Sequence, residues 1–265
     1  MNCRYSLHQQ LIPTMLNTSA YLVRIGYTGS LGPTADTLRA LHRAHMLTVP
    51  FENLDIGLGR TIPCDAEAAV RKIVERRRGG FCYELNSAFA ALLQALGFPV
   101  TLLSARVSRE DGSASPEFDH LTLRVDLDEP WLADVGFGDS FLEPLRLQTG
   151  VEQTDGRRRF HLRREGDCLQ MEMADLTGGT WKREYLFTLT PRTLEEFAAM
   201  CHYHQTSLES PFTRRRICSR ATEEGRITLA DRTLIVTREG KKEESPLNSE
   251  EEWRSALQKH FALTL

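Results

Sequence analysis

The 265-residue sequence predicts an α+β protein, because helical and strand-like patterns occupy different parts of the chain. In the first third, apolar residues recur at helical spacing, and in the middle third short runs alternate between apolar and polar residues. The last third mixes both patterns. The runs of the middle third are divided by Asp, Gly and Pro, and they predict an antiparallel barrel or a strongly curved sheet.

Helices are expected in the first third at residues 33–49, 65–78 and 82–96. Pro50 ends the first of them, and Asp65 is placed to cap the second. The second helix closes on a basic run, which suits the negative end of its dipole, and Gly79 and Gly80 then break it. The third helix is strongly apolar and stops at Gly97.

Strands are expected in the middle third at residues 100–107, 120–127, 131–135, 160–164, 169–173 and 184–190. A short helix, a hairpin and a closing helix are expected in the last third, at residues 194–200, 226–229 with 233–236, and 249–261. Pro191 suits the first position of the short helix, and Asp231 lies in the turn of the hairpin. Residues 238–244 are predicted to form a charged, solvated turn. The sequence has no internal repeat.

The composition is that of a globular protein without an unusual charge. Lys and Arg number 33 against 36 Asp and Glu, so the formal net charge is −3. These values exclude a mostly disordered chain and a highly basic nucleic-acid binder. No apolar run reaches the ~18 residues that a membrane span needs. Gln9 and Gln10 stand where a signal peptide has its apolar core, so we expect a cytoplasmic protein with no nucleic acid and no membrane as partners.

The six cysteines form neither a metal-binding nor a disulfide pattern. None belongs to a CxxC pair, and six are too sparse for a disulfide scaffold in a chain of this length. We therefore expect a reducing compartment and no metal. Five of the six are interpreted as small core residues: Cys3, Cys64, Cys168, Cys201 and Cys218.

Cys82 differs from the others, because a Gly-Gly turn places it at the start of a helix. The unpaired N–H groups and the positive dipole end of a helix favour a thiolate over a thiol. Arg78 lies close by in the sequence and would add to that effect. Since the thiolate is the reactive form of cysteine, Cys82 is the candidate nucleophile.

A cysteine nucleophile needs a base and a group that orients the base. His120 opens a strand-like run, where a ring is held rigidly and can face a cleft, so it is the candidate base. Asp134 ends the next short strand and is placed to accept the Nδ1–H of that histidine. Asp119 and Asp126 compete for this role, and spacing does not choose among the three. Histidines in helical patterns or near the termini are interpreted as surface or core residues: His8, His42, His45 and His260.

Several segments, taken in order, resemble motifs of the arylamine N-acetyltransferase family. Residues 78–86 (RGGFCYELN) are similar to its RGG-aromatic-Cys box, and residues 50–54 (PFENL) to its PFENL motif. Residues 134–138 (DVGFG) are similar to its DVGFG segment. Residues 203–207 (YHQTS) and 210–212 (SPF) resemble a later Y-x-x-T-S…S-x-F region. The order and approximate spacing of these segments match the family, and the resemblance covers nearly the whole chain.

The resemblance implies a catalytic triad on Cys82, His120 and Asp134, which selects Asp134 over its competitors. It also implies a three-part fold with a papain-like or transglutaminase-like core. Residues 1–98 would form the helical bundle, which carries the cysteine. Residues 99–190 would form the β-barrel, which carries the histidine and the aspartate. Residues 191–265 would form the α/β lid with its linking helix.

The implied reaction is a ping-pong transfer from acetyl-CoA, a co-substrate, to a small aromatic amine or hydrazine, as in xenobiotic metabolism. Candidates for contacts with acetyl-CoA are Gly136, Phe137, Gly138 and Tyr203. Candidates for the acceptor wall are Phe51, Val107 and Phe137, because aryl substrates need apolar surroundings. Glu52 and Arg78 are interpreted as a supporting ion pair that holds the turn before Cys82. A monomer or a homodimer would fit.

A different cysteine acyl-enzyme is the main alternative, namely a hydrolase, an amide synthase or a longer-chain acyltransferase on the same fold. A non-catalytic binding module is disfavoured, because such a relative would be expected to lose one residue of the triad. The chain departs from the family pattern in a slightly short spacing between His120 and Asp134. It also departs at Glu209 and Pro211, where some relatives have small hydroxyl residues.

Overall fold

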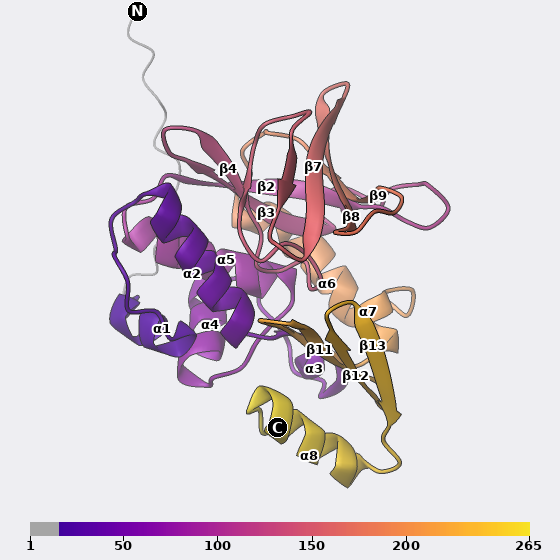
Figure 1. Cartoon of the computed structure of the whole chain (residues 1–265). Helices are drawn as coiled ribbons and strands as arrows, with labels where there is room; N and C mark the ends of the chain where they lie inside the picture. The colour runs from indigo at the N-terminus through magenta and orange to yellow at the C-terminus, as the bar shows by residue number, and fades with distance from the viewer. Residues whose placement is uncertain (1–15) are drawn as a thin grey trace, which may run out of the picture.

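A computed structural model describes residues 16–265 and contains two antiparallel sheets with helices beside and between them (Figure 1). In the view of Figure 1 the larger sheet lies at the top, the N-terminal helices lie at the left, and the smaller sheet lies below with the C-terminal helix. Cys3 and His8 lie outside the described residues. Within residues 16–265, no helix combines the length and the apolar character that crossing a membrane requires.

The N-terminal region is helical, as predicted. Its helices are α1 (Thr18–Ile25), α2 (Ala35–Thr48), α3 (Leu54–Gly57), α4 (Ala66–Val70), a π-helical turn (Arg71–Glu75) and α5 (Cys82–Ala95). Asp65 caps α4 by accepting a hydrogen bond from the Ala68 N–H. The second predicted helix ends at Glu75, before the basic run. Residues 82–93 are all buried, because α5 packs against α4 on one side and strands of the larger sheet on another.

The middle region forms a nearly closed, barrel-like sheet of eight antiparallel strands, as the alternating pattern predicts. The strands are β2 (Val100–Val107), β3 (His120–Asp126), β4 (Pro130–Ala133), β5 (Leu145–Arg146), β6 (Glu152–Thr154), β7 (Arg158–Glu165), β8 (Cys168–Asp175) and β9 (Lys182–Phe187). Their order in the sheet is β5-β4-β3-β2-β9-β8-β7-β6. Large apolar side chains such as Phe160, Met171 and Phe187 fill a core of their own there. The strands β5 and β6 were not predicted from the sequence, because they are very short.

The C-terminal region pairs with the N-terminal one in the smaller sheet. Its elements are a 3-10 helix (Leu194–Phe197), α6 (Ala198–Thr206), α7 (Pro211–Arg214), β10 (Ile217–Thr222), β11 (Gly225–Ala230), β12 (Thr233–Arg238), β13 (Lys241–Pro246) and α8 (Glu250–Phe261). These strands continue a sheet whose edge strand, β1 (Phe51–Glu52), comes from the N-terminal region. The sequence segment that carries Phe51 and Glu52 is thereby fixed against the last third of the chain.

The structure corrects four details of the prediction. Pro191 lies outside the helix, because Thr193 caps the 3-10 helix and its N–H donates to the Glu196 side chain at 2.7 Å. Residues 238–244 are mostly strand, because charged side chains suit the exposed edge strand β13. Helix α1 was missed. Two of the cysteines interpreted as core residues are only partly buried, namely Cys64 and Cys168.

Candidate active site

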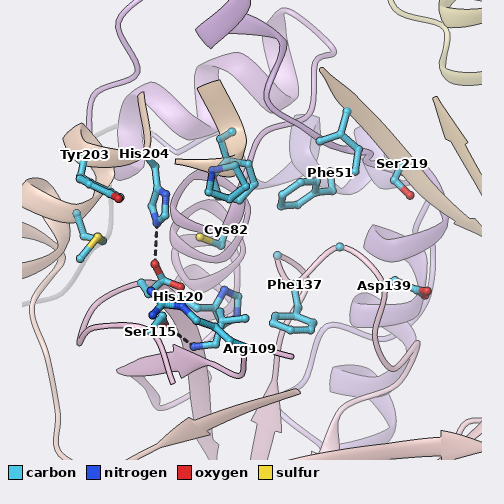
Figure 2. Close-up of a pocket in the computed structure, with 18 of the residues that line it drawn as sticks. Phe51, Cys82, Arg109, Ser115, His120, Phe137, Asp139, Tyr203, His204 and Ser219 are labelled. Carbon is cyan, nitrogen blue, oxygen red and sulfur yellow. Dashed lines mark hydrogen bonds and ion pairs between the residues drawn. The ribbon is translucent and has the colours of Figure 1, made fainter. Parts of the chain in front are cut away.

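A cavity of about 850 Å³ lies where the helical region, the barrel and the C-terminal sheet meet (Figure 2). In Figure 2, Cys82 lies at its centre, with Phe51 and Phe137 on one side and Tyr203 and His204 on the other. Most of the residues predicted for the site line this cavity: Phe51, Cys82, Val107, His120, Gly136, Phe137, Gly138 and Tyr203. The structure places three others behind its wall: Glu52, Arg78 and Asp134.

Cys82 is the first residue of α5, as the Gly-Gly turn predicts. The Glu84 side chain accepts a hydrogen bond from the Phe81 N–H at 3.1 Å and so closes the helix start. A Cβ atom at Gly79 would lie 1.9 Å from the Pro50 carbonyl oxygen, so only glycine fits in the turn. The exposed fraction of Cys82 is 4%, which leaves the sulfur reachable mainly from the cavity.

Burial raises the pKa of the Cys82 thiol well above its ordinary value. The backbone N–H groups of Leu121 and Tyr83 act in the opposite direction, and the carboxylates of Asp119 and Asp134 raise the pKa further. The sequence predicted a thiolate favoured by the helix dipole and by Arg78. Burial outweighs the helix start, so the pKa of the thiol is raised and not lowered.

His120 begins β3, and its Nε2 atom lies 2.6 Å from Asp134 Oδ2. The predicted contact was to Nδ1, so the ring is turned the other way, and Nδ1 is left for a partner in the cavity. Asp119 and Asp126, the two competing acids, bind other groups: Asp119 pairs with His204, and Asp126 with Arg124. Among the three acids, Asp134 is the one that the fold brings to the His120 ring.

Asp134 is fully buried and is held from several directions. Its Oδ1 accepts hydrogen bonds from Asn86 Nδ2 at 2.9 Å and from the Gly136 N–H at 3.0 Å. Burial alone would raise the pKa of Asp134, but the charge of His120 and the hydrogen bonds from His120 and Asn86 lower it below its ordinary value. Asp134 therefore carries a negative charge at the back of the His120 ring.

Two residues that support Asp134 were missed as functional in the sequence. Asn86 reaches from α5 to the Leu121 carbonyl oxygen at 2.6 Å and accepts from the Val135 N–H at 2.9 Å. His42 was interpreted as a surface or core residue. It is buried, and its Nε2 accepts the Asp134 N–H at 3.1 Å. Asn86 belongs to the same nine-residue segment as Cys82, which is the one signal that singles it out.

Glu52 and Arg78 form the predicted ion pair, with Arg78 Nε 3.0 Å from Glu52 Oε1. Arg78 Nη2 also lies 3.2 Å from Asp55 Oδ1, and Lys72 joins the cluster at 2.8 Å from Asp55 and 2.9 Å from Glu84. The guanidinium is thus bound to the carboxylates of Glu52 and Asp55. These contacts favour a structural role for Arg78 in holding the turn before α5.

Comparison with known proteins identifies relatives of this chain in sequence and in fold. A family model described as N-acetyltransferase matches residues 34–265. The arylamine N-acetyltransferase of Mycolicibacterium smegmatis is 35% identical, with 94% of this chain and 93% of that protein covered. Human arylamine N-acetyltransferase 1 is 33% identical, with 94% and 95% covered.

The chain belongs to the arylamine N-acetyltransferase family.

Solved structures of the family agree with this assignment. The arylamine N-acetyltransferase from Salmonella typhimurium superimposes with a TM-score of 0.88 at 31% identity, covering 93% of this chain and 90% of the other. The Mycobacterium marinum arylamine N-acetyltransferase, solved in complex with CoA, superimposes with a TM-score of 0.86 at 31% identity, covering 93% and 92%. The chain is accordingly an acyltransferase with the fold of this family, a mixed helical and barrel-like architecture.

The glycine-bearing loop of this family member has no room for larger residues beside Cys82. A Cβ atom at Gly136 would lie 2.7 Å from Asn86 Nδ2 and 2.8 Å from the Cys82 Cα atom. Gly138 has φ of 92°, a left-handed conformation that side chains avoid. Between the two glycines, the Phe137 ring contacts His120 edge-on, with ring centres 5.1 Å apart. The loop thus places the Phe137 ring against His120, and Cys82 still lines the cavity.

The cavity is also lined by polar residues that the sequence did not single out: Arg109, Ser115, Asp139, His204, Ser219, Arg226 and Thr228. Asp139 binds both Arg158 of the barrel and Arg226 of the C-terminal sheet, at 2.9 Å in each case. Asp119 and His204 form a second histidine–carboxylate pair at 3.0 Å. Asp139 and Arg226 are 87 positions apart in the sequence, and Asp119 and His204 are 85 apart, so no local sequence pattern predicts these pairs.

Proposed function

We propose that this enzyme transfers an acetyl group from acetyl-CoA to an aromatic amine or hydrazine, through an acetyl-Cys82 intermediate. The observation that carries the proposal is the placement of Cys82 and His120 on one cavity, with Asp134 bound to the far side of the His120 ring at 2.6 Å. A nucleophile, a base and an orienting acid are the parts that acyl transfer through cysteine requires.

In the first half-reaction, the Cys82 S–H proton moves to His120 Nδ1 as the sulfur attacks the thioester carbonyl carbon. The bond to the CoA sulfur breaks, and His120 returns the proton to that sulfur. The backbone N–H groups of Tyr83 and Leu121, which act on the Cys82 sulfur, are the donors that we assign to the negative charge on the carbonyl oxygen. Acetyl-Cys82 and free CoA result.

In the second half-reaction, the amine nitrogen attacks the carbonyl carbon of acetyl-Cys82. His120 takes a proton from that nitrogen, the carbon–sulfur bond breaks, and the proton passes to the Cys82 sulfur. Asp134 keeps the His120 ring oriented in both half-reactions. Because CoA leaves before the amine attacks acetyl-Cys82, donor and acceptor bind in turn, which is a ping-pong order.

The walls of the cavity suit an aromatic acceptor and a pantetheine chain. Phe51, Val107 and Phe137 supply the apolar surface that we assign to the acceptor. Gly136, Gly138 and Tyr203, together with Phe137, are the contacts that we assign to acetyl-CoA. The Mycobacterium marinum relative solved with CoA supports this co-substrate for the family fold. Glu209 and Pro211 also line the cavity.

The proposal is tested by intact-protein mass spectrometry after mixing with acetyl-CoA in the absence of any acceptor. We expect one acetyl group on the unaltered protein and on Cys168→Ser, a matched change at a partly buried cysteine that does not line the cavity. We expect none on Cys82→Ala. Addition of an aniline or an aryl hydrazide should discharge the acetyl group. Acetylation of Cys82→Ala would refute the nucleophile, and no acetylation of the unaltered protein would refute the donor.

A further inference from the structure

Arg226 carries a buried guanidinium on the wall of the cavity, and one of its nitrogen atoms has no partner. The residue is 9% exposed. Its Nε atom lies 2.9 Å from Asp139 Oδ1, and its Nη1 atom donates to Ser219 Oγ at 2.9 Å. Within residues 16–265, the buried Nη2 atom has no hydrogen-bond acceptor. A buried, charged donor without an acceptor destabilises a fold, so this nitrogen points to a partner outside the chain.

Arg226 belongs to the face of the smaller sheet that lines the cavity. Thr228 lies two positions further along β11, Ser219 of β10 pairs with Thr228, and Phe51 of β1 pairs with Ser219. Alternate residues of one strand share a face of a sheet, and so do residues that pair across strands. All four of these residues line the cavity. The strands therefore hold the guanidinium on the same wall as the Phe51 ring.

Two aromatic rings lie between this guanidinium and Cys82. Figure 2 shows Phe51 and Phe137 between Cys82 on one side and Ser219 and Asp139 on the other. Because the guanidinium binds both Ser219 and Asp139, it lies at that far end of the cavity. An aromatic ring that packs against Phe51 and Phe137 with its amine toward Cys82 would therefore turn its opposite side toward the guanidinium.

The carboxylate of Asp139 does not cancel the charge at this end of the cavity. Its two oxygen atoms also bind Arg158, at 2.9 Å each, so two guanidinium groups share one carboxylate. The Asp139 side chain is 52% exposed, so water screens its charge, whereas Arg226 is buried. A second guanidinium on the cavity, that of Arg109, is exposed, so water can bind it. A negatively charged group on a ligand therefore gains most by binding Arg226.

We propose that Arg226 is a specificity-determining residue, which binds an anionic group, a carboxylate or a sulfonate, on the ring of the acceptor. The inference rests on the proposed function in taking Phe51 and Phe137 as walls for that ring. A guanidinium binds such a group through charge-assisted hydrogen bonds, and these are stronger where water is excluded. The enzyme would then prefer aromatic amines that carry an acid group to neutral amines of the same shape.

The test compares each acid with the amide of the same shape. With acetyl-CoA as donor, kcat/KM is measured for 3- and 4-aminobenzoate and for 3- and 4-aminobenzamide. In the unaltered protein we expect at least one acid to exceed its amide about tenfold or more, and Arg226→Gln to lower that ratio about 10- to 100-fold. Arg226→Lys keeps a cation but not the planar fork, so it should retain part of the preference. Arg109→Gln, at the exposed guanidinium, is the matched control and should change the ratio less than about twofold.

Three results would overturn the inference. The first is an unaltered protein that does not prefer either acid, and the second is a preference that Arg226→Gln keeps. The third is a rise in the KM for acetyl-CoA without a change in the ratio, which would assign the guanidinium to a phosphate of the donor. Circular dichroism shows whether each variant is folded, and Arg226→Lys replaces a glutamine variant that does not fold.

Binding without reaction separates this inference from the proposed function. The 3- and 4-methylbenzoates have no amine to acetylate, and calorimetry measures their Kd against those of the matching methylbenzamides in the absence of acetyl-CoA. We expect the same preference for an acid and the same loss in Arg226→Gln. A protein that keeps this preference but takes no acetyl group would refute the proposed function alone. A protein that takes the acetyl group but binds acid and amide equally would refute this inference alone.

Discussion

The two histidine–aspartate pairs on the cavity have the same chemistry in different surroundings. Asp134 is fully buried, and Asn86, the Gly136 N–H and His120 all donate to its carboxylate. The Asp119 side chain is 15% exposed and depends on His204 and Ser115. The first pair is fixed by the core of the protein, and the second is fixed by a contact between two regions of the chain.

This difference indicates how each pair can work. A carboxylate with several fixed donors keeps its charge and its orientation, so it suits the task of holding a ring through repeated proton transfers. A partly exposed pair with few donors responds more readily to pH and to substitution. We therefore assign orientation of the base to the inner pair, Asp134 with His120. The outer pair, Asp119 with His204, connects α6 to the segment that carries His120.

The largest effect that separates the two pairs is expected from exchanging each aspartate for asparagine. Asp134→Asn would stabilise the wrong tautomer of His120, and we expect kcat to fall about 10³- to 10⁴-fold, as for the acid of other triads. Asp119→Asn should change kcat less than about tenfold, because Asp119 pairs with His204 and does not bind the His120 ring. Steady-state kinetics with acetyl-CoA and an arylamine measures both. Equal losses in the two variants would remove the distinction between the pairs.

The sequence predicts the inner pair better than the outer one, for a physical reason. His120 and Asp134 lie near each other in two strands that pair directly, so a short-range pattern contains them. The structure adds what the pattern lacks, namely that Nε2 and not Nδ1 faces the acid. That choice depends on how the ring packs against Phe137 and Tyr185, which the sequence does not reveal.

The outer pair could not be found from the sequence, because its members meet only when helix α6 packs against the segment before β3. The same limit applies to His42, which reaches the backbone of Asp134 from a residue 92 positions away. Prediction was also misled about the Cys82 thiol, since the helix start is a local feature whereas burial comes from the whole fold. Local elements such as the Asp65 cap and the hairpin turn at Asp231 were predicted correctly for the converse reason.

The second-largest effect is expected from removing the side chain of Asn86, which supports Asp134 of the inner pair. Asn86→Ala removes the hydrogen bonds to Leu121, Asp134 and Val135, so we expect the free energy of unfolding to fall by about 1–3 kcal/mol or more. Gln94→Ala, on the same helix but at a partly exposed position, is the control and should change it by less than about 0.5 kcal/mol. Urea denaturation measures both. An Asn86→Ala variant as stable as the control would show that Asp134 does not need this support.

The smallest effect is a pH dependence of the free energy of unfolding that comes from His42, which accepts a hydrogen bond from the Asp134 N–H. Burial lowers the pKa of His42 from 6.5 to about 4 in the folded protein. Below pH 6.5, His42 is protonated in the unfolded chain but not in the folded one. The contribution of neutral His42 to the free energy of unfolding is therefore fully present above pH 6.5 and is lost as the pH falls toward 4. His42→Gln keeps an acceptor for the Asp134 N–H and a donor for the Leu142 carbonyl oxygen but does not titrate.

Between pH 7.5 and pH 6, we therefore expect the unaltered protein to lose about 1 kcal/mol more free energy of unfolding than His42→Gln. Glu84 acts in the opposite sense, because burial raises its pKa to about 7 and its contribution is lost as the pH rises. That contribution is common to both proteins and cancels in the difference, so the comparison and not the slope of either protein is the measurement. Urea denaturation at the two pH values supplies it. Equal losses in the two proteins would mean that His42 has the same pKa in the folded and unfolded states, which would contradict its lowered pKa.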